Sequence, residues 1–229
     1  MNKIILPEYI TTQPSTGKKI TFRPFTVKEE KSLLLALQEN DVNIVVNAIK
    51  SVVKVCTDNK VDVEKIPYYD MEFIFLQIRA KSIGETIDLI GSCDCSETAK
   101  TEFYVDITEA YLEPTPTGEQ MFKIIDTPYT IKFTHPSLSD FSKKLSDVDY
   151  SAEQVVTNCI RDIFTDDEVV TMTDEEKLGF IESMTSLQQR PIAEFLKNMP
   201  LTKIPAKYTC KVCKKEHAIP LSGFQNFFV

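Results

Sequence analysis

Two short cysteine pairs, far apart in the chain, constrain its fold more than any other feature. The first pair is Cys93 and Cys95, the second is Cys210 and Cys213, and each is flanked by residues that alternate as in a β-hairpin. If the pairs meet in space, they supply four thiolates to one tetrahedral ion. The sequence therefore predicts a structural zinc site that joins the middle of the chain to its C-terminal part.

The cysteine spacing leaves other readings open. Cys210-x-x-Cys213 has the common ligand spacing, whereas Cys93-x-Cys95 is one residue shorter than usual, and His217 is a possible substitute ligand. The alternative to a shared site is two separate pairs of surface or half-buried thiols. Redox chemistry at the second pair is disfavoured, because no helix N-terminus follows it to stabilise a thiolate.

Length and composition restrict the class of protein. With 229 residues the chain can bury a hydrophobic core, and we expect one compact unit with two lobes. No apolar run approaches the ~20 residues of a membrane span. The first residues lack a signal-peptide pattern, so we expect the protein to stay in the compartment where it is made, with reduced thiols. A net charge of −8 and scattered basic residues argue against nucleic acid as a partner.

Apolar periodicity predicts an α+β fold, in which helical lobes surround a small antiparallel sheet that carries a zinc-ribbon-like cysteine knot. Asp70 is expected to cap the third helix, and Pro191 to break or restart the last helical pattern. Cys56 and Cys159 fall on apolar helical stripes and are predicted core residues. The expected helices cover about residues 27–39, 44–56, 71–83, 137–145, 151–164 and 173–184, and the expected strands 4–12, 18–25, 86–92, 100–107, 120–125 and 129–134.

These patterns divide the chain into four segments. They are an N-terminal hairpin and helical lobe (1–84), an antiparallel β module with the first cysteine pair (85–134), a second helical lobe (135–202), and a C-terminal cysteine hairpin with an aromatic tail (203–229). We expect the last segment to pack on the β module.

No arrangement of residues makes a positive case for catalysis. His135 and His217 lie outside any nucleophile or metalloprotease pattern, and we expect both to be structural. The contiguous acids at 166–168 and 174–176 are typical of solvated helix starts. Because glycine-rich phosphate loops and hydrolase motifs are missing, we expect a non-enzymatic scaffold or binding protein. A thiol- or metal-dependent enzyme is the alternative, and a closed four-thiolate site would count against it.

Two segments are candidates for binding a partner protein. Arg23 and Phe25 flank a proline at the end of an extended segment, which can offer backbone groups and one directional charge to a partner strand. The alternative is a solvated helix start, with Phe25 stapled onto the first helix. Phe224, Phe227 and Phe228 either pack back on the chain or anchor another protein. If Arg23 is a docking residue, Arg23→Glu weakens assembly with little change in melting temperature.

Several strings of residues resemble the baseplate hub proteins of T-even-type (T4-like) contractile-tailed bacteriophages. They are residues 21–31 (TFRPFTVKEEK), residues 75–85 (FLQIRAKSIGE), the middle cysteine pair, residues 132–137 (KFTHPS), and residues 221–228 (LSGFQNFF) after the second pair. The stretch 138–203 shows no such similarity. The short Cys93-x-Cys95 spacing departs from the paired Cys-x-x-Cys pattern of that family.

The resemblance implies a non-enzymatic role in assembling the central hub of the tail baseplate. It places the protein in the cytoplasm of the infected bacterial host during assembly, with other baseplate hub or tape-measure proteins as partners. Two roles stay open at this point. One is a transient assembly factor or chaperone, and the other is a permanent hub subunit in the virion.

Overall fold

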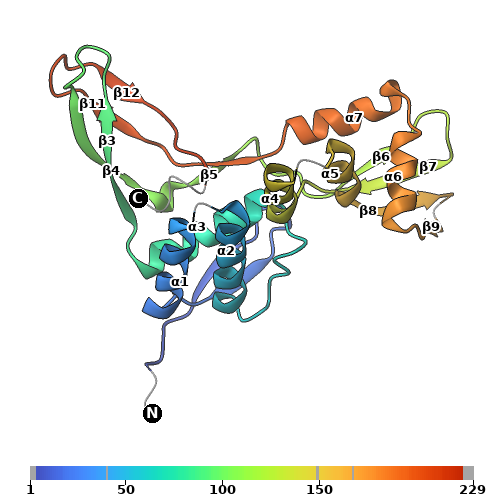
Figure 1. The fold of residues 1–229 in the computed structure, drawn as a ribbon, viewed down its shortest axis with the longest axis horizontal. Coiled ribbons are helices and arrows are strands. Elements are labelled where there is room, and N and C mark those ends of the chain that lie inside the picture. The colour runs from blue at the N-terminus through green and yellow to red at the C-terminus, as the bar shows by residue number, and fades with distance from the viewer. Residues whose placement is uncertain (1–3, 40, 148–149, 167, 224–229) are drawn as a thin grey trace.

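The computed structural model describes residues 4–39, 41–147, 150–166 and 168–223. Over these residues the chain forms helices and small antiparallel sheets, which confirms the expected α+β class. Figure 1 shows three parts, which we call the helical body (residues 9–82), the cysteine arm (86–106 with 207–218) and the sheet lobe (120–197).

The helical body begins with a hairpin, which three helices follow. Its elements are β1 (Tyr9–Thr12), β2 (Lys19–Phe22), α1 (Val27–Gln38), α2 (Val42–Cys56) and α3 (Tyr68–Ser82). A capping box of Thr26 and Glu29 starts α1, and the Asp41 carboxylate accepts from the N–H of Asn43 to start α2. Helix α3 is buried on nearly all sides, so it forms the centre of the body.

The expectation that Asp70 caps α3 is wrong. The N-cap is Pro67, and Asp70 lies in the first turn with its carboxylate directed at the turn between β1 and β2. It accepts hydrogen bonds from Gln13 Nε2 at 2.7 Å and from the N–H of Ser15 at 2.9 Å, as well as from the Ser15 hydroxyl. Burial raises the pKa of Asp70 against these bonds. Asp70 therefore fastens the hairpin to α3.

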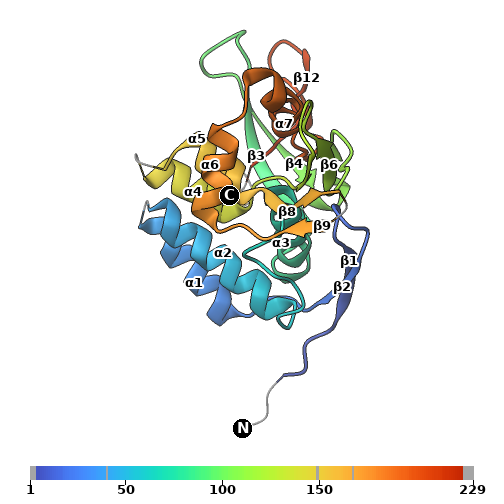
Figure 2. The same ribbon diagram turned by 90° about the vertical axis from the view of Figure 1, so that its right-hand side faces the viewer.

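The cysteine arm consists of two hairpins that lie side by side (Figures 1 and 2). They are built from β3 (Thr86–Ser92) with β4 (Lys100–Asp106), and from β11 (Lys207–Thr209) with β12 (Glu216–Ala218). Tyr208 joins them, because its ring stacks on Phe103 at 4.8 Å and its hydroxyl donates to the carbonyl of Ser92. The same ring lies over Gly91, where a Cβ atom would come within 2.4 Å of it. Only glycine fits there.

The sheet lobe holds a four-stranded antiparallel sheet and a second hydrophobic core. Its strands, in the order β6-β7-β8-β9, are β6 (Gln120–Lys123), β7 (Tyr129–Phe133), β8 (Ile160–Thr165) and β9 (Glu168–Val170). The helices of this part are α4 (Leu138–Ser146), α5 (Ala152–Asn158), α6 (Asp174–Glu182) and α7 (Ser186–Lys197). Ile131, Phe133, Cys159 and Ile163 belong to this core, which is separate from the core of the helical body.

A short link connects the lobe with the cysteine arm. After η1 (Ile107–Glu109), β5 (Tyr111–Glu113) pairs with β10 (Leu201–Lys203), which follows α7. The sequence places the strands between 86 and 134 in one small sheet, whereas the structure divides them between β3–β4 and the four-stranded sheet. Within the described ranges, no helix has the length and apolar character needed to cross a membrane.

Two helix predictions are wrong in the sheet lobe. The helix expected over 151–164 ends at Asn158, and the following residues form β8, because Ile163 pairs with Ile131 and Ile160 with Phe133 on the sheet. Pro191 lies inside α7 without ending it. A proline there removes one helical hydrogen bond, but the next residue, Ile192, is buried in the second core and holds the helix in place.

Candidate functional site

The four predicted metal ligands meet where the two hairpins of the cysteine arm turn. Cys93 and Cys95 follow β3, and Cys210 and Cys213 lie in the turn between β11 and β12. The four Sγ atoms all lie within 4.8 Å of one another. Cys93 Sγ is 3.6 Å from Cys213 Sγ, and Cys95 Sγ is 3.7 Å from Cys210 Sγ. Each close pair therefore joins one hairpin to the other.

These separations fit a metal ion better than a disulfide. A disulfide requires a sulfur–sulfur distance of about 2.05 Å. Four sulfurs placed tetrahedrally at ~2.3 Å from a zinc ion are about 3.8 Å apart, close to the two distances observed. The four cysteines can therefore bind one metal ion, as the sequence predicts.

The surroundings of the sulfurs favour a thiolate at Cys210, whereas burial and the neighbouring thiols raise the pKa of Cys95 to about 12. Cys210 is fully buried, and Cys93 and the neighbouring Ala99 are nearly so. The N–H groups of Cys213 and Val212 point at the Cys210 sulfur and, against the effect of burial, lower its pKa to about 6. Lysines 211, 214 and 215 lie in the same turn and offset the negative charge of a tetrathiolate site.

His217, the proposed substitute ligand, lies outside this cluster of ligand atoms in the described structure. Its ring stacks on Tyr208 at 4.7 Å with an interplanar angle of 7°, so it supports the second hairpin. Cys56 and Cys159 are buried in the two cores, as predicted, and burial raises the pKa of both thiols. The described structure thus separates two core thiols from four clustered ones.

Arg23 and Phe25, the predicted docking residues, both make contacts within the chain. The guanidinium of Arg23 binds both carboxylate oxygens of Glu29, at 2.6 and 3.2 Å. Phe25 is 7% exposed and packs in the core of the helical body. Burial raises the pKa of Glu29, but hydrogen bonds from Arg23 and Thr26 outweigh it and hold the value at about 2. A partner contact at Arg23 stays a prediction, and Phe224, Phe227 and Phe228 lie outside the described residues.

Because of this ion pair, Arg23→Glu is expected to lower stability rather than leave it unchanged. The substitution places a second carboxylate beside Glu29, and Glu29 belongs to the capping box at the start of α1. The loss should be about 1 to 2 kcal/mol, because solvent screens this partly exposed pair. Urea unfolding measures it. Lys28→Glu is the control, since it makes the same charge change on an exposed side chain of the same turn. Equal losses in the two variants would contradict a specific role for the pair.

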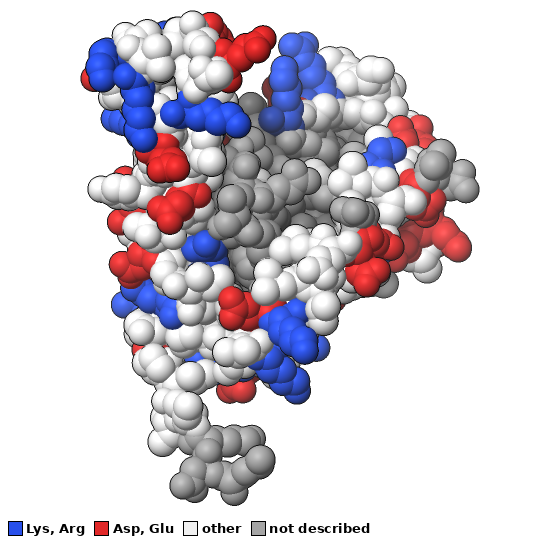
Figure 3. Space-filling view, turned by 60° about the vertical axis from the view of Figure 1, so that its left-hand side comes forward, with Lys and Arg blue, Asp and Glu red and all other residues white. Residues whose placement is uncertain are grey.

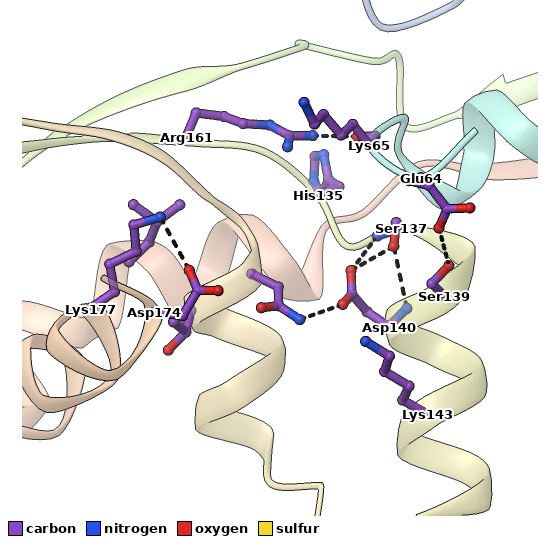
Figure 4. Close-up of a pocket in the computed structure, with 13 residues that line it drawn as sticks. Glu64, Lys65, His135, Ser137, Ser139, Asp140, Lys143, Arg161, Asp174 and Lys177 are labelled. Carbon is purple, nitrogen blue, oxygen red and sulfur yellow. Dashed lines mark hydrogen bonds and ion pairs between the residues drawn. The ribbon is translucent and has the colours of Figure 1, made fainter. Parts of the chain in front are cut away.

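A polar pocket of about 300 Å³ lies where α4, α5 and α6 approach the loop before α3 (Figure 4). In it, Asp140 accepts hydrogen bonds from Ser137, Tyr150 and Asn158. His135 is 2% exposed, and its Nε2 lies 3.2 Å from the carbonyl oxygen of Phe195.

Burial lowers the pKa of His135 to about 4, so its imidazole is neutral at pH 7. Its ring stacks on that of Phe195 at 3.9 Å. These contacts agree with the structural role expected for His135. The capping pattern Ser137-x-x-Asp140 is visible in the sequence, but the partners of Asp140 on other elements are not.

The face of the molecule in Figure 3 carries acidic and basic side chains intermixed, without a continuous basic stripe among the residues described there.

Comparison with known proteins gives one match. A family model described as "T4 bacteriophage base plate protein" matches residues 6–229, which includes both cysteine pairs and the stretch 138–203, where no similarity was evident from short strings. No curated protein and no solved structure matches the chain. A match over nearly the whole chain shows membership, and the chain therefore belongs to the family of T4 bacteriophage base plate proteins.

Proposed function

We propose that this baseplate protein is a non-enzymatic assembly factor of the tail baseplate hub, with a zinc ion as the structural centre of its cysteine arm. The observation that carries the proposal is the cluster of four sulfurs, within 4.8 Å of one another, on two hairpins from distant parts of a chain of the baseplate family.

The donor set supports a structural zinc rather than a catalytic one. Structural zinc sites have four protein ligands, whereas catalytic sites keep one position for water or substrate. All four ligands here come from the chain, and four thiolates match the common Cys₄ class. The alternative is a thiol- or metal-dependent enzyme. A catalytic metal would need an open ligand position, and a set of four cysteine ligands does not support one.

The partners that we propose are other baseplate hub or tape-measure proteins, met in the cytoplasm of the infected host. Family membership supports partners among baseplate proteins. The net charge of −8 and the intermixed charges in Figure 3 support protein partners over nucleic acid. The second candidate is a permanent subunit of the hub, which the same family membership favours equally.

Quantitative mass spectrometry separates these two roles. We expect affinity-tagged protein from infected cells to bring down hub or tape-measure proteins, and purified virions to contain far less than one copy per hub position. An infection with the untagged protein is the control for the pull-down. Stoichiometric recovery from virions would exclude a purely transient factor and establish the permanent subunit, while absence of baseplate proteins from the pull-down would contradict both.

A further inference from the structure

Strand β3 forms an open edge of the cysteine arm. The arm projects from the helical body (Figure 1), and β3 and β4 form a two-stranded sheet within it. The second hairpin of the arm packs chiefly against β4. Among the described residues, the opposite side of β3 therefore has no strand beside it. A free edge of this kind can pair with a strand from another protein.

The ladder between β3 and β4 determines which backbone groups face the open edge. At one end of the ladder, the N–H of Ile107 donates to the carbonyl of Glu85 at 2.8 Å. At the other end, the N–H of Cys93 donates to the carbonyl of Ala99 at 3.2 Å. Bonded and non-bonded pairs alternate along an antiparallel ladder, so the odd-numbered residues of β3 bond to β4. The even-numbered residues therefore direct their N–H and C=O groups away from β4.

Most of these outward-directed groups have no hydrogen-bond partner in the described part of the chain. The residues concerned are Thr86, Asp88 and Ile90. At the next even-numbered residue, Ser92, the carbonyl oxygen accepts from the hydroxyl of Tyr208. The second hairpin thus closes the edge near the tip of the arm and leaves it open from residue 86 to residue 90.

The side chains at this edge make a solvent-facing surface of apolar and acidic groups. Ile90 is 66% exposed, and Tyr104, which lies opposite Asp88, is 72% exposed. Ile90 in turn lies opposite Glu102, so each of the two apolar side chains has an exposed carboxylate as its cross-strand neighbour. A strand added at the edge would place its own side chains next to Asp88 and Ile90.

The charge of this surface distinguishes between a second copy and a different partner. A third carboxylate, that of Asp106, lies opposite Thr86, whereas Lys100 lies at the closed end opposite Ser92. If two copies joined their β3 edges antiparallel, the two acidic surfaces would lie side by side around Asp88. Like charges on neighbouring strands are destabilising, and opposite charges are stabilising. The edge therefore disfavours a second copy and suits a strand with basic side chains.

We propose that the open edge of β3 binds an extended segment of another protein in which basic side chains occupy alternate positions. The segment adds a third strand to the sheet through the backbone groups of Asp88 and Ile90, and its basic side chains lie near Asp88 and Glu102. The inference describes how a partner binds, and it rests on the proposed function for the source of that partner, the infected cell.

Site-specific photocrosslinking in infected cells identifies the bound segment. p-Benzoylphenylalanine replaces Ile90 in the full chain, and crosslinked peptides are sequenced by mass spectrometry. We expect peptides of another protein with lysine or arginine at alternate positions. The same group at Leu187, an exposed leucine of α7, is the control and should not capture them. Crosslinks to a second copy only, to segments without this basic pattern, or to no other protein would overturn the inference. A basic segment from outside the baseplate would support it and contradict the hub function instead.

Hydrogen exchange measured by NMR tests strand addition directly, with a synthetic peptide of the crosslinked sequence. In the free protein, the amides of Leu89 and Gly91 bond to β4 and should be protected, whereas those of Asp88 and Ile90 should exchange rapidly. Saturating peptide should slow exchange at Asp88 and Ile90 by about tenfold or more. Unchanged exchange at both amides with the peptide bound would overturn the inference.

Two substitutions separate backbone pairing from charge, with peptide affinity measured by fluorescence anisotropy. Ile90→Pro removes an N–H that points away from β4, so the ladder within the arm is kept. It should weaken binding about fivefold relative to Ile90→Thr, which retains the N–H. Asp88→Lys should also weaken binding about fivefold, whereas Glu175→Lys, at an exposed glutamate of α6, should not. Equal affinities of the two Ile90 variants would overturn backbone pairing, and an unchanged affinity of Asp88→Lys would overturn the basic partner.

Discussion

Cys210→Ser is expected to remove the bound metal ion and to unfold the tip of the cysteine arm, while the helical body remains folded. Among the described residues, the small buried cluster at these turns consists of Cys93, Cys210 and Ala99, so this end of the arm has almost no hydrophobic core. Binding of a structural zinc ion contributes on the order of 10 kcal/mol to such a site. The second hairpin has strands of three residues each and is too short to be stable alone.

Metal analysis and hydrogen exchange measure the two parts of this result. The intact protein should contain about one zinc ion per chain. The variant should contain almost none, and its amides in β11 and β12 should lose protection while those of α3 keep it. Cys159→Ser is the matched control, because Cys159 is equally buried but lies in the core of the sheet lobe. It should lower stability and retain the ion. A metal-free intact protein with an ordered arm would refute the site.

The intact protein is expected to lose stability as the pH rises from 4.5 to 7, and Glu72→Gln is expected to abolish most of that loss. Glu72 is 1% exposed in α3, and its carboxylate accepts a hydrogen bond of 3.3 Å from the N–H of Thr202 in β10. Burial outweighs the hydrogen bonds that the carboxylate accepts from Thr202, Gly223 and Tyr68, and it raises the pKa of Glu72 from 4.5 to about 7. The folded state thus favours the protonated carboxyl. Its contribution to stability is complete below pH 4.5 and is lost as the pH rises through about 7.

The size of that loss follows from the pKa difference between the unfolded and folded states. A shift from 4.5 to about 7 corresponds to on the order of 3 kcal/mol. Glutamine stays neutral, so the variant should be the more stable protein at pH 8 by an amount of this order. Urea unfolding at pH 5 and pH 8 measures it. Glu102→Gln, at an exposed glutamate of β4, should leave the pH profile unchanged. A Glu72→Gln profile that still falls between these pH values would rule out Glu72 as the cause.

The sequence predicts the helical body well because the signals there are local. Each helix start is set by a capping residue directly before it, Thr26 for α1 and Asp41 for α2. The apolar stripe that predicts α2 lies within that helix itself. Asp70 shows where local signals fail. A carboxylate before a helical stripe is typical of a cap, but its partners are Gln13 and Ser15, which only the folded chain brings near.

The prediction of a helix where the structure has β8 is wrong for a related reason. Its isoleucines fit a helical stripe as well as a strand, and the decision comes from β7, which offers Ile131 and Phe133 as neighbours across the sheet. The pairing of β5 with β10 has no sequence signal at all, since each is only three residues long. The cysteine cluster could be predicted despite its long sequence separation, because thiolates in pairs have few other uses in a reduced protein.

The joining of distant segments also sets an order in time during synthesis. Cys95 and Cys210 are 115 residues apart, and β5 likewise precedes its partner β10 by most of the second half of the chain. A ribosome that adds ~5–20 residues per second takes roughly 6 to 23 s to cover this interval. Until then the first two thiols lack their counterparts and β5 has an unpaired edge. Only a chain translated past Cys213 can close the arm. Products released before that point keep two free thiols, at Cys93 and Cys95, and their unpaired strand β5 is open to proteases.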